Sequence, residues 1–166
     1  NAGVRVLSAL PDFDETNPSI AWPWAVWQKR DVRVAGAPAQ LVARNLVTDA
    51  LRPVSPTAAD QLDPNVDADR VVWQDWRDVG PGEIYFQDLE SGEESRITAN
   101  PAGQYRPVLS GPVVVWQDNR NGQLDLYGFD LRDGTEIRLT QTPADESSPA
   151  ICGSTPDGSS SDIRPT

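Results

Sequence analysis

A proline stands nine residues before a tryptophan at three places in this chain of 166 residues. The three pairs are Pro18 with Trp27, Pro64 with Trp73, and Pro107 with Trp116. Successive tryptophans are 46 and 43 residues apart, and a fourth proline, Pro149, follows Pro107 by 42 residues. A self-similar period of this size restricts the chain to an array of equivalent structural units.

The clearest of these units, residues 107–140, predicts four short antiparallel strands. Its apolar runs are rich in Val, Leu, Tyr and Phe, which is typical of strands. The turns between the runs contain Gly111, Asn121-Gly122 and Asp133-Gly134, and Gly and Asn readily adopt the positive φ of tight hairpins. One such sheet cannot bury both of its faces alone, so the units must stack. A period in the forties with four strands per unit is typical of a β-propeller blade.

We therefore predict an all-β fold of β-propeller blades, each of four antiparallel strands, in a domain that covers residues 1–152. Three full blades are predicted at about residues 18–54, 64–98 and 107–140. The first blade diverges most from the repeat. Its third and fourth strands are predicted near residues 32–34 and 41–47, with an extension at 51–54.

Two flanking strands are predicted besides the full blades. Residues 4–8 match the outermost strand of a blade, and residues 149–152 match the innermost strand of a fourth blade. Residues 153–166 are rich in Ser, Gly and Pro and read as a tail or linker. Three full blades are fewer than the four that a closed propeller usually needs, and open end blades would expose apolar faces. We therefore predict an incomplete propeller that another protein chain or a second copy completes.

The composition excludes several function classes. The 25 acidic and 14 basic residues give a net charge of −11, which argues against nucleic acid or an anionic membrane as partner. No apolar run is long enough to span a bilayer. The chain has no histidine, which rules out His-based triads and His-ligated metals, and the single Cys152 has no His to activate it. No P-loop or dinucleotide fingerprint is present, so we predict no cofactor, metal or catalytic residue.

Residues that recur in each unit are predicted to hold the scaffold. Trp27, Trp73 and Trp116 occupy one repeat position and are expected to pack between blades. Asp75 with Arg77, and Asp118 with Arg120, are expected to form an ion pair that fixes a hairpin once per blade. The loop from Asp118 to Asp125 loosely resembles an oxygen-rich cation loop, but Arg120 in its middle disfavours that alternative.

Residues that do not recur are the better candidates for a binding site. Trp76 is expected in the turn between a second and a third strand, and Trp22 in a turn between a first and a second strand. An exposed aromatic ring is a frequent anchor for a protein partner. Acidic residues are predicted on the same rim as Trp76: Asp12, Asp14, Glu15, Asp60, Asp63, Asp145 and Glu146. This rim is either a docking surface for a basic partner or simply a solvated face.

The repeat resembles that of TolB-like (WD40-like) β-propellers. The shared pattern is Trp-Gln-Asp-x-Arg, then a strand that ends in Tyr-x-x-Asp-Leu, a Gly turn and Arg-Leu/Ile-Thr, as from Trp73 to Thr98 and from Trp116 to Thr140. The resemblance is good over residues 64–152 and loose over 4–54, where Lys29-Arg30-Asp31 replaces Asp-x-Arg. It implies an exported propeller, whether periplasmic, cell-surface or secreted, that mostly binds proteins.

The function predicted from the sequence is a non-catalytic exported β-propeller module for protein–protein interaction or assembly. The alternative is a carbohydrate-binding or polysaccharide-active propeller, in which Trp22, Trp24 and Trp76 would stack on sugar rings. The two hypotheses differ in one feature of the structure. The carbohydrate hypothesis requires the three rings to be exposed in one cleft beside carboxylates.

Overall fold

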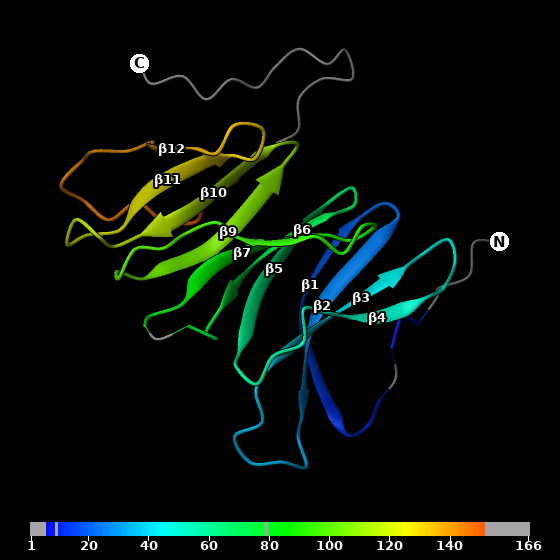
Figure 1. The fold of residues 1–166 in the computed structure, drawn as a ribbon. Coiled ribbons are helices and arrows are strands. Elements are labelled where there is room, and N and C mark those ends of the chain that lie inside the picture. Colours follow the sequence, from blue (N-terminus) through cyan, green and yellow to red (C-terminus); the bar gives the residue numbers. More distant parts are fainter. Residues whose placement is uncertain (1–5, 9, 79, 152–166) are drawn as a thin grey trace.

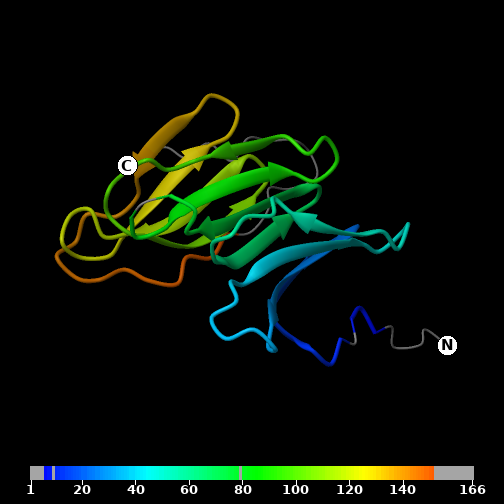
Figure 2. The same ribbon diagram turned by 60° about the horizontal axis from the view of Figure 1, so that its bottom comes forward.

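The computed structural model describes residues 6–8, 10–78 and 80–151, which form three antiparallel sheets of four strands each (Figures 1 and 2). The first sheet contains β1 (Phe13–Ala21), β2 (Trp24–Asp31), β3 (Gln40–Asn45) and β4 (Leu51–Val54). The second contains β5 (Gln61–Asp67), β6 (Arg70–Asp75), β7 (Glu83–Asp88) and β8 (Glu94–Arg96). The third contains β9 (Gln104–Ser110), β10 (Val113–Asp118), β11 (Asp125–Asp130) and β12 (Thr135–Arg138).

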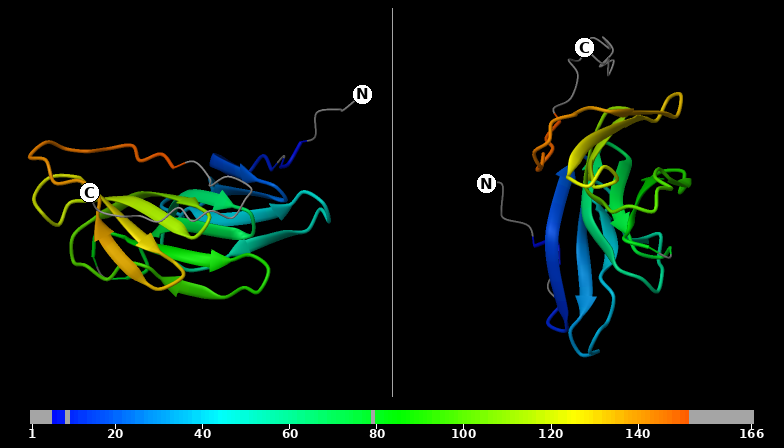
Figure 3. Two further views of the ribbon diagram at one scale, coloured as in Figure 1. Left: turned by 90° about the horizontal axis from the view of Figure 1, so that it is seen from above. Right: turned by 90° about the vertical axis from the view of Figure 1, so that its left-hand side faces the viewer.

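Each sheet keeps its strands in sequence order, with every neighbouring pair antiparallel. The three sheets follow one another in a row, with the first sheet in blue to cyan at one end and the third in yellow to orange at the other (Figure 3). The all-β class and the open arrangement of propeller blades are thus confirmed. No helix in the described part of the chain could cross a membrane.

A bulge next to the proline marks the first strand of every blade. The residue before the proline has a positive φ in all three: 49° at Asn17, 50° at Asp63 and 50° at Arg106. The strand register shifts at the same place in each sheet, because the left-handed residue leaves one extra position on the bulged strand. Ser148, before Pro149, has a φ of 59°, so the backbone after the third blade repeats this conformation.

Neither of the two predicted flanking segments forms a strand in the residues that the structure describes. Residues 149–151 belong to no sheet of the described chain, and Cys152 lies outside the described residues. Residues 6–8 are not in a strand, and residues 4 and 5 lie outside the described residues, as does the predicted tail at 153–166. The Leu7 carbonyl accepts a hydrogen bond from the Arg44 guanidinium, so residues 6–8 lie against the first blade.

Two strands of the first blade were predicted at the wrong place. The third strand is β3, not residues 32–34, and the fourth is β4, not residues 41–47; Val32 and Val34 are exposed in the connection between β2 and β3. Valine favours strands, but the Asp31 carboxylate accepts the Arg33 amide at 3.0 Å and bonds its guanidinium. This local turn, followed by Gly36 with a φ of 74°, outweighs the weak strand propensity of two valines.

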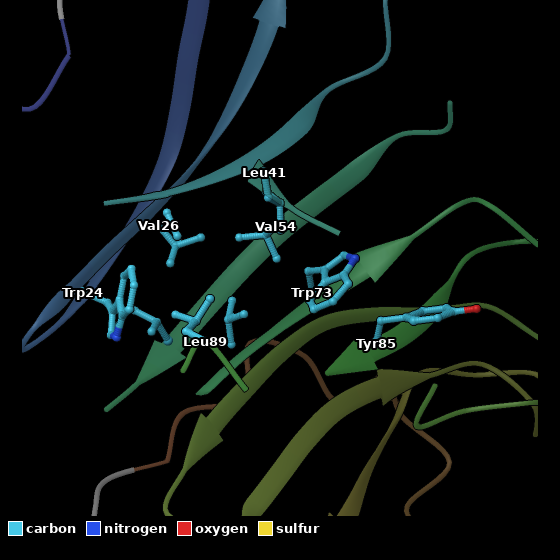
Figure 4. Close-up of a cluster of buried hydrophobic side chains, with 10 residues drawn as sticks. Trp24, Val26, Leu41, Val54, Trp73, Tyr85 and Leu89 are labelled. Carbon is cyan, nitrogen blue, oxygen red and sulfur yellow. The ribbon is translucent and has the colours of Figure 1, made fainter. Parts of the chain in front are cut away.

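Two apolar clusters hold the blades together. The cluster between the first and second blades includes Trp24, Val26 and Leu41 on one side, and Trp73 and Tyr85 on the other (Figure 4). The cluster between the second and third blades repeats this pattern, with Val72 and Ile84 against Val114, Trp116 and Tyr127. Side chains alternate along each second strand, so the tryptophan faces the preceding blade and its valine neighbour faces the following one.

Candidate functional site

A buried carboxylate organises the second blade at the end of β6. Asp75 accepts hydrogen bonds from the Trp73 indole at 2.7 Å and from Arg77 at 2.6 Å to its guanidinium and 2.9 Å to its amide. Burial alone would raise the pKa of Asp75, but the hydrogen bonds from Arg77 and Trp73 outweigh it and hold that pKa below its usual value. This cluster fixes the turn after β6.

The third blade repeats the cluster. Asp118 accepts the Trp116 indole at 3.1 Å and the Arg120 guanidinium at 2.6 Å, and Arg120 also bonds Glu136 at 2.6 Å. The hydrogen bond to Asp118 raises the pKa of Arg120 above its usual value. The Arg120 guanidinium lies 4.1 Å from the centre of the Tyr127 ring, a cation–π contact. Because every polar group here has a partner within its own blade, the cluster is a structural element.

The first blade uses different partners at the same repeat position. Lys29 replaces the aspartate, and its ammonium lies 3.9 Å from the centre of the Phe13 ring. The Trp27 indole donates instead to Glu15 at 3.0 Å. Asp12 lies 3.4 Å from the Arg33 guanidinium. Of the acidic residues predicted near the start of the chain, two are therefore engaged within the first blade.

Asp60 and Asp145 were both predicted to bind a partner. In the structure each binds the backbone of the preceding blade. Asp60 accepts the Ala39 amide at 2.7 Å, and the Gln61 amide donates back to the Ala39 carbonyl at 2.8 Å. Asp145 accepts the Leu124 amide at 2.8 Å, and the Glu146 amide donates to the Leu124 carbonyl at 2.7 Å. The same pair of bonds thus precedes the second blade and the segment that starts at Glu146.

The carboxylates of Glu146 and Asp63 also have partners in the chain. The Glu146 carboxylate accepts the Thr140 hydroxyl at 2.7 Å and also bonds the Thr142 hydroxyl. Asp63 lies within β5 rather than in a connection between blades, and its carboxylate accepts the Asn17 amide at 3.1 Å. A sequence signal for Asp60 and Asp145 existed, because both stand four residues before a repeat proline. Their shared position pointed to a repeated structural role.

The aromatic candidates do not form one cleft. Trp76 is 40% exposed beyond β6, and Trp22 is 70% exposed in the turn between β1 and β2. Trp22 precedes the second strand of its blade and Trp76 follows the second strand of its own blade, so the two rings lie at opposite ends of their blades. Trp24 is buried between blades and donates its indole N–H to Asp69 at 2.9 Å. The stacking role considered for Trp24 is therefore wrong, and the three rings cannot share a sugar-binding cleft.

The exposed apolar residues gather at the first blade instead. Eight of the ten large apolar side chains that are exposed in the described residues lie at or before β4. They are Val6, Leu10, Ile20, Trp22, Val32, Val34, Val47 and Leu51. Sequence reasoning did not identify this group, because six of its eight members lie outside the strands, where the repeat pattern makes no prediction. Within the described chain, no group of three or more acidic or Cys side chains is arranged to hold a metal ion.

Neither a scan against protein-family models nor a search of curated proteins found a match, but solved structures do match. TolB from Acinetobacter baumannii matches with a TM-score of 0.62 at 17% identity, over 80% of this chain and 34% of that one. The β-propeller domain of the Trilobed protease from Pyrococcus furiosus gives 0.60 at 12% identity, over 79% and 44%. An oligogalacturonate lyase in complex with manganese gives 0.66 at 11% identity, over 84% and 45%.

These matches show the fold, a TolB-like β-propeller, and confirm the resemblance seen in the repeat at that level. The chain spans about a third of the TolB chain and less than half of the other two. Two of the three matched proteins are named as a protease and a lyase, so the shared fold leaves open whether this chain has enzymatic activity.

Proposed function

We propose that this chain is a protein-assembly module that binds another protein by accepting its strands onto the unfinished fourth blade at residues 146–151. Strand addition of this kind uses the main chain for affinity and alternate side chains for specificity. The module is non-catalytic, and the absence of histidine from the whole sequence supports this. Export to the periplasm, cell surface or medium is part of the proposal and rests on the TolB-like resemblance.

The observation that carries the proposal is the state of residues 146–151. The Asp145 and Glu146 bonds to Leu124 reproduce those that precede the second blade, and Ser148 repeats the left-handed bulge residue. The segment thus begins with the same bonds and the same left-handed residue as the innermost strand of the second blade. In the described chain no second strand pairs with it. An unpaired strand edge of this kind favours pairing with another chain.

Trp76 and Trp22 were also proposed to contact a partner, but neither lies at residues 146–151. Trp76 packs over Gly82, where an added Cβ would come within 3.2 Å of the ring, and its exposed part remains a candidate anchor on the rim with Asp60. Trp22 is a candidate on the opposite rim. Neither needs a sugar ligand. With Trp24 in the core, no arrangement of aromatic rings favours the carbohydrate alternative.

Blocking the strand edge tests the proposal. By repeat position Ala150 corresponds to Val108. The amide of the next residue, Leu109, points away from β10 and towards Asn65, so the Val108 amide points towards β10. The Ala150 amide should in the same way face the strand that would pair with residues 146–151. Ala150→Pro removes that amide. We expect the immobilised full chain to retain a partner from its native source, and Ala150→Pro to retain at least about tenfold less.

The matched control is Ala150→Val, which keeps the amide and favours an extended backbone. It should retain the partner as the unsubstituted chain does, and cross-links from the partner should fall on residues 146–151. Equal retention by the Ala150→Pro chain, or no retained protein at all, would refute the proposed function. Circular dichroism of both variants should match that of the parent, because Ala150 is exposed.

A further inference from the structure

One repeat position holds an aromatic ring in the first interface between blades and an arginine in the second. Trp24 and Arg70 each stand three residues before the tryptophan of their second strand. Each also pairs with the last residue of the third strand of its blade. Trp24 is only 6% exposed and donates its indole N–H to Asp69 of the following blade at 2.9 Å. In the first interface this position is therefore filled by a flat ring.

A cation lies beside that ring. The Arg52 guanidinium is 5.0 Å from the centre of the Trp24 ring, within the range of a cation–π contact. Arg52 pairs with Ala43 and Ser95 pairs with Phe86. Because Ala43 and Phe86 each pair with the valine before the repeat tryptophan, Ser95 takes the position of Arg52 in the second blade. The second interface thus has neither the ring nor the cation at these two positions.

A groove of about 430 Å³ lies at this place between the second and third blades. Half-buried aromatic rings line it from both blades, Phe86 from β7 and Phe129 from β11. Arg70 also lines the groove, and its guanidinium donates a hydrogen bond to the Gly111 carbonyl at 3.0 Å. A concave site of this volume, lined by apolar rings and a few polar groups, is typical of a small-molecule site.

The groove carries one carboxylate that is free to bind a cation. Glu93 is exposed on its border, and within the described residues its carboxylate has no hydrogen bond or ion pair. The positive charge of Arg70 lies across from Asp88, with which Arg70 pairs in register. The whole chain has a net charge of −11. A molecule that enters the groove is therefore favoured when it carries a positive charge near Glu93.

We infer that the groove formed by Phe86, Phe129 and Glu93 binds a small aromatic amine, a flat ring joined to an ammonium group by a short linker. The ring stacks against the two phenylalanine rings, and the ammonium pairs with the Glu93 carboxylate. The ligand supplies the ring and the cation that Trp24 and Arg52 supply in the first interface. The site belongs to the second and third blades and does not depend on the function proposed for residues 146–151.

Titration with tryptamine, an indole ring joined to an ammonium group, tests the inference. In amide NMR spectra of the full chain, we expect the signals of Ser95 and Gly134, which both border the groove, to shift. The dissociation constant should be about 1 mM or tighter. Indole-3-propionate has the same ring with a carboxylate, and hexylamine has an ammonium without a ring. Each should bind at least about tenfold more weakly than tryptamine.

Three variants separate the groove from the rest of the surface. Glu93→Gln should weaken tryptamine binding about three- to fivefold, as expected for the loss of an exposed ion pair. Glu90→Gln is the matched control and should leave binding unchanged, because Glu90 is exposed in the same connection but does not line the groove. Ser95→Arg introduces the residue of the first blade and should weaken binding at least about tenfold, since the guanidinium fills the groove and repels the ammonium. Ser95 is exposed, so the fold should be retained.

Several results would overturn the inference. Signals of Ser95 and Gly134 that do not move up to about 10 mM tryptamine would mean that the groove does not bind the amine. Equal binding of hexylamine, or no effect of Glu93→Gln and Ser95→Arg, would mean that the net charge alone attracts the amine. Equal binding of indole-3-propionate would remove the role of Glu93. Signals that shift with protein concentration without tryptamine would show that a second copy occupies the groove.

Discussion

At the scale of single residues, acidic side chains that look alike in the sequence have different roles. Asp75 is buried and bound by an indole and a guanidinium. Asp145 is exposed, yet its carboxylate holds a backbone amide. Recurrence allowed the first role to be predicted, because an Asp two residues before an Arg appears in two blades. The second was missed because a loop carboxylate reads as solvated unless its position in the repeat is considered.

Replacing the buried carboxylate should destabilise the fold in a pH-dependent way. Asp75→Asn leaves Arg77 without its buried anion, and we expect a loss of about 3 kcal/mol in the free energy of unfolding at neutral pH. The pKa of Asp75 is lower in the folded protein than its ordinary 3.8. As the pH falls, the unfolded chain therefore takes up the proton first. The stabilisation that the Asp75 carboxylate contributes is complete above the ordinary pKa of Asp75. It is lost as the pH falls through the pKa that Asp75 has in the folded protein.

Urea unfolding at a series of pH values, followed by tryptophan fluorescence, measures this difference. The gap between parent and Asp75→Asn should be constant from about pH 5 to 8 and should shrink below about pH 4. Glu90→Gln, a change at an exposed residue, should stay within about 0.5 kcal/mol of the parent at neutral pH. A gap that does not change down to about pH 2 would contradict the assignment of the pKa shift to Asp75.

At the scale of strands and sheets, the fold followed from the sequence wherever the repeat was regular. The second and third blades share Val-Val-Trp-Gln-Asp in their second strands, and this fixed both the strand and the face of each side chain. The first blade was harder, because Val32 and Val34 favour a strand that the Asp31–Arg33 turn prevents. The left-handed residue before each proline was not predicted, since Asn17, Asp63 and Arg106 share no side-chain type.

The interface between sheets should be far more sensitive than the exposed rims. Trp73 is fully buried between the first and second blades, and Trp73→Ala should cost about 3–5 kcal/mol through lost burial and the cavity that remains. Trp22→Ala removes an exposed ring and should change stability by less than about 0.5 kcal/mol. Thermal or urea unfolding measures both. Equal losses would mean that Trp22 is packed and that the interface between the sheets does not dominate stability.

At the scale of the whole molecule, the open row has two unlike ends. One end carries residues 146–151, which we propose begin a fourth blade and which are anchored through Asp145 and Glu146. The other carries the first blade, at which most of the exposed apolar side chains lie. The sequence predicted that the propeller is open, because the repeat can be counted. The exposed apolar side chains at one end lie outside the repeat pattern, as Leu51 and Val47 do. Counting repeats therefore could not predict which end is the more apolar.

The exposed apolar side chains of the first blade should therefore dominate the binding of apolar probes by the native chain. The dye 1-anilinonaphthalene-8-sulfonate fluoresces when it lies on an exposed apolar surface. Ile20 and Leu51 are exposed on the face of the first sheet opposite to its buried cluster, because they pair with Ala25 and Arg44, which are not in that cluster. We expect Ile20→Asp combined with Leu51→Asp to reduce dye fluorescence by about half or more. Leu139→Asp, at an exposed leucine beyond the third blade, should reduce it by less than about a tenth. Unfolding midpoints of both variants should stay close to that of the parent, because all three side chains are exposed. Equal reductions by the two variants would mean that the dye binds mainly elsewhere than on the first blade.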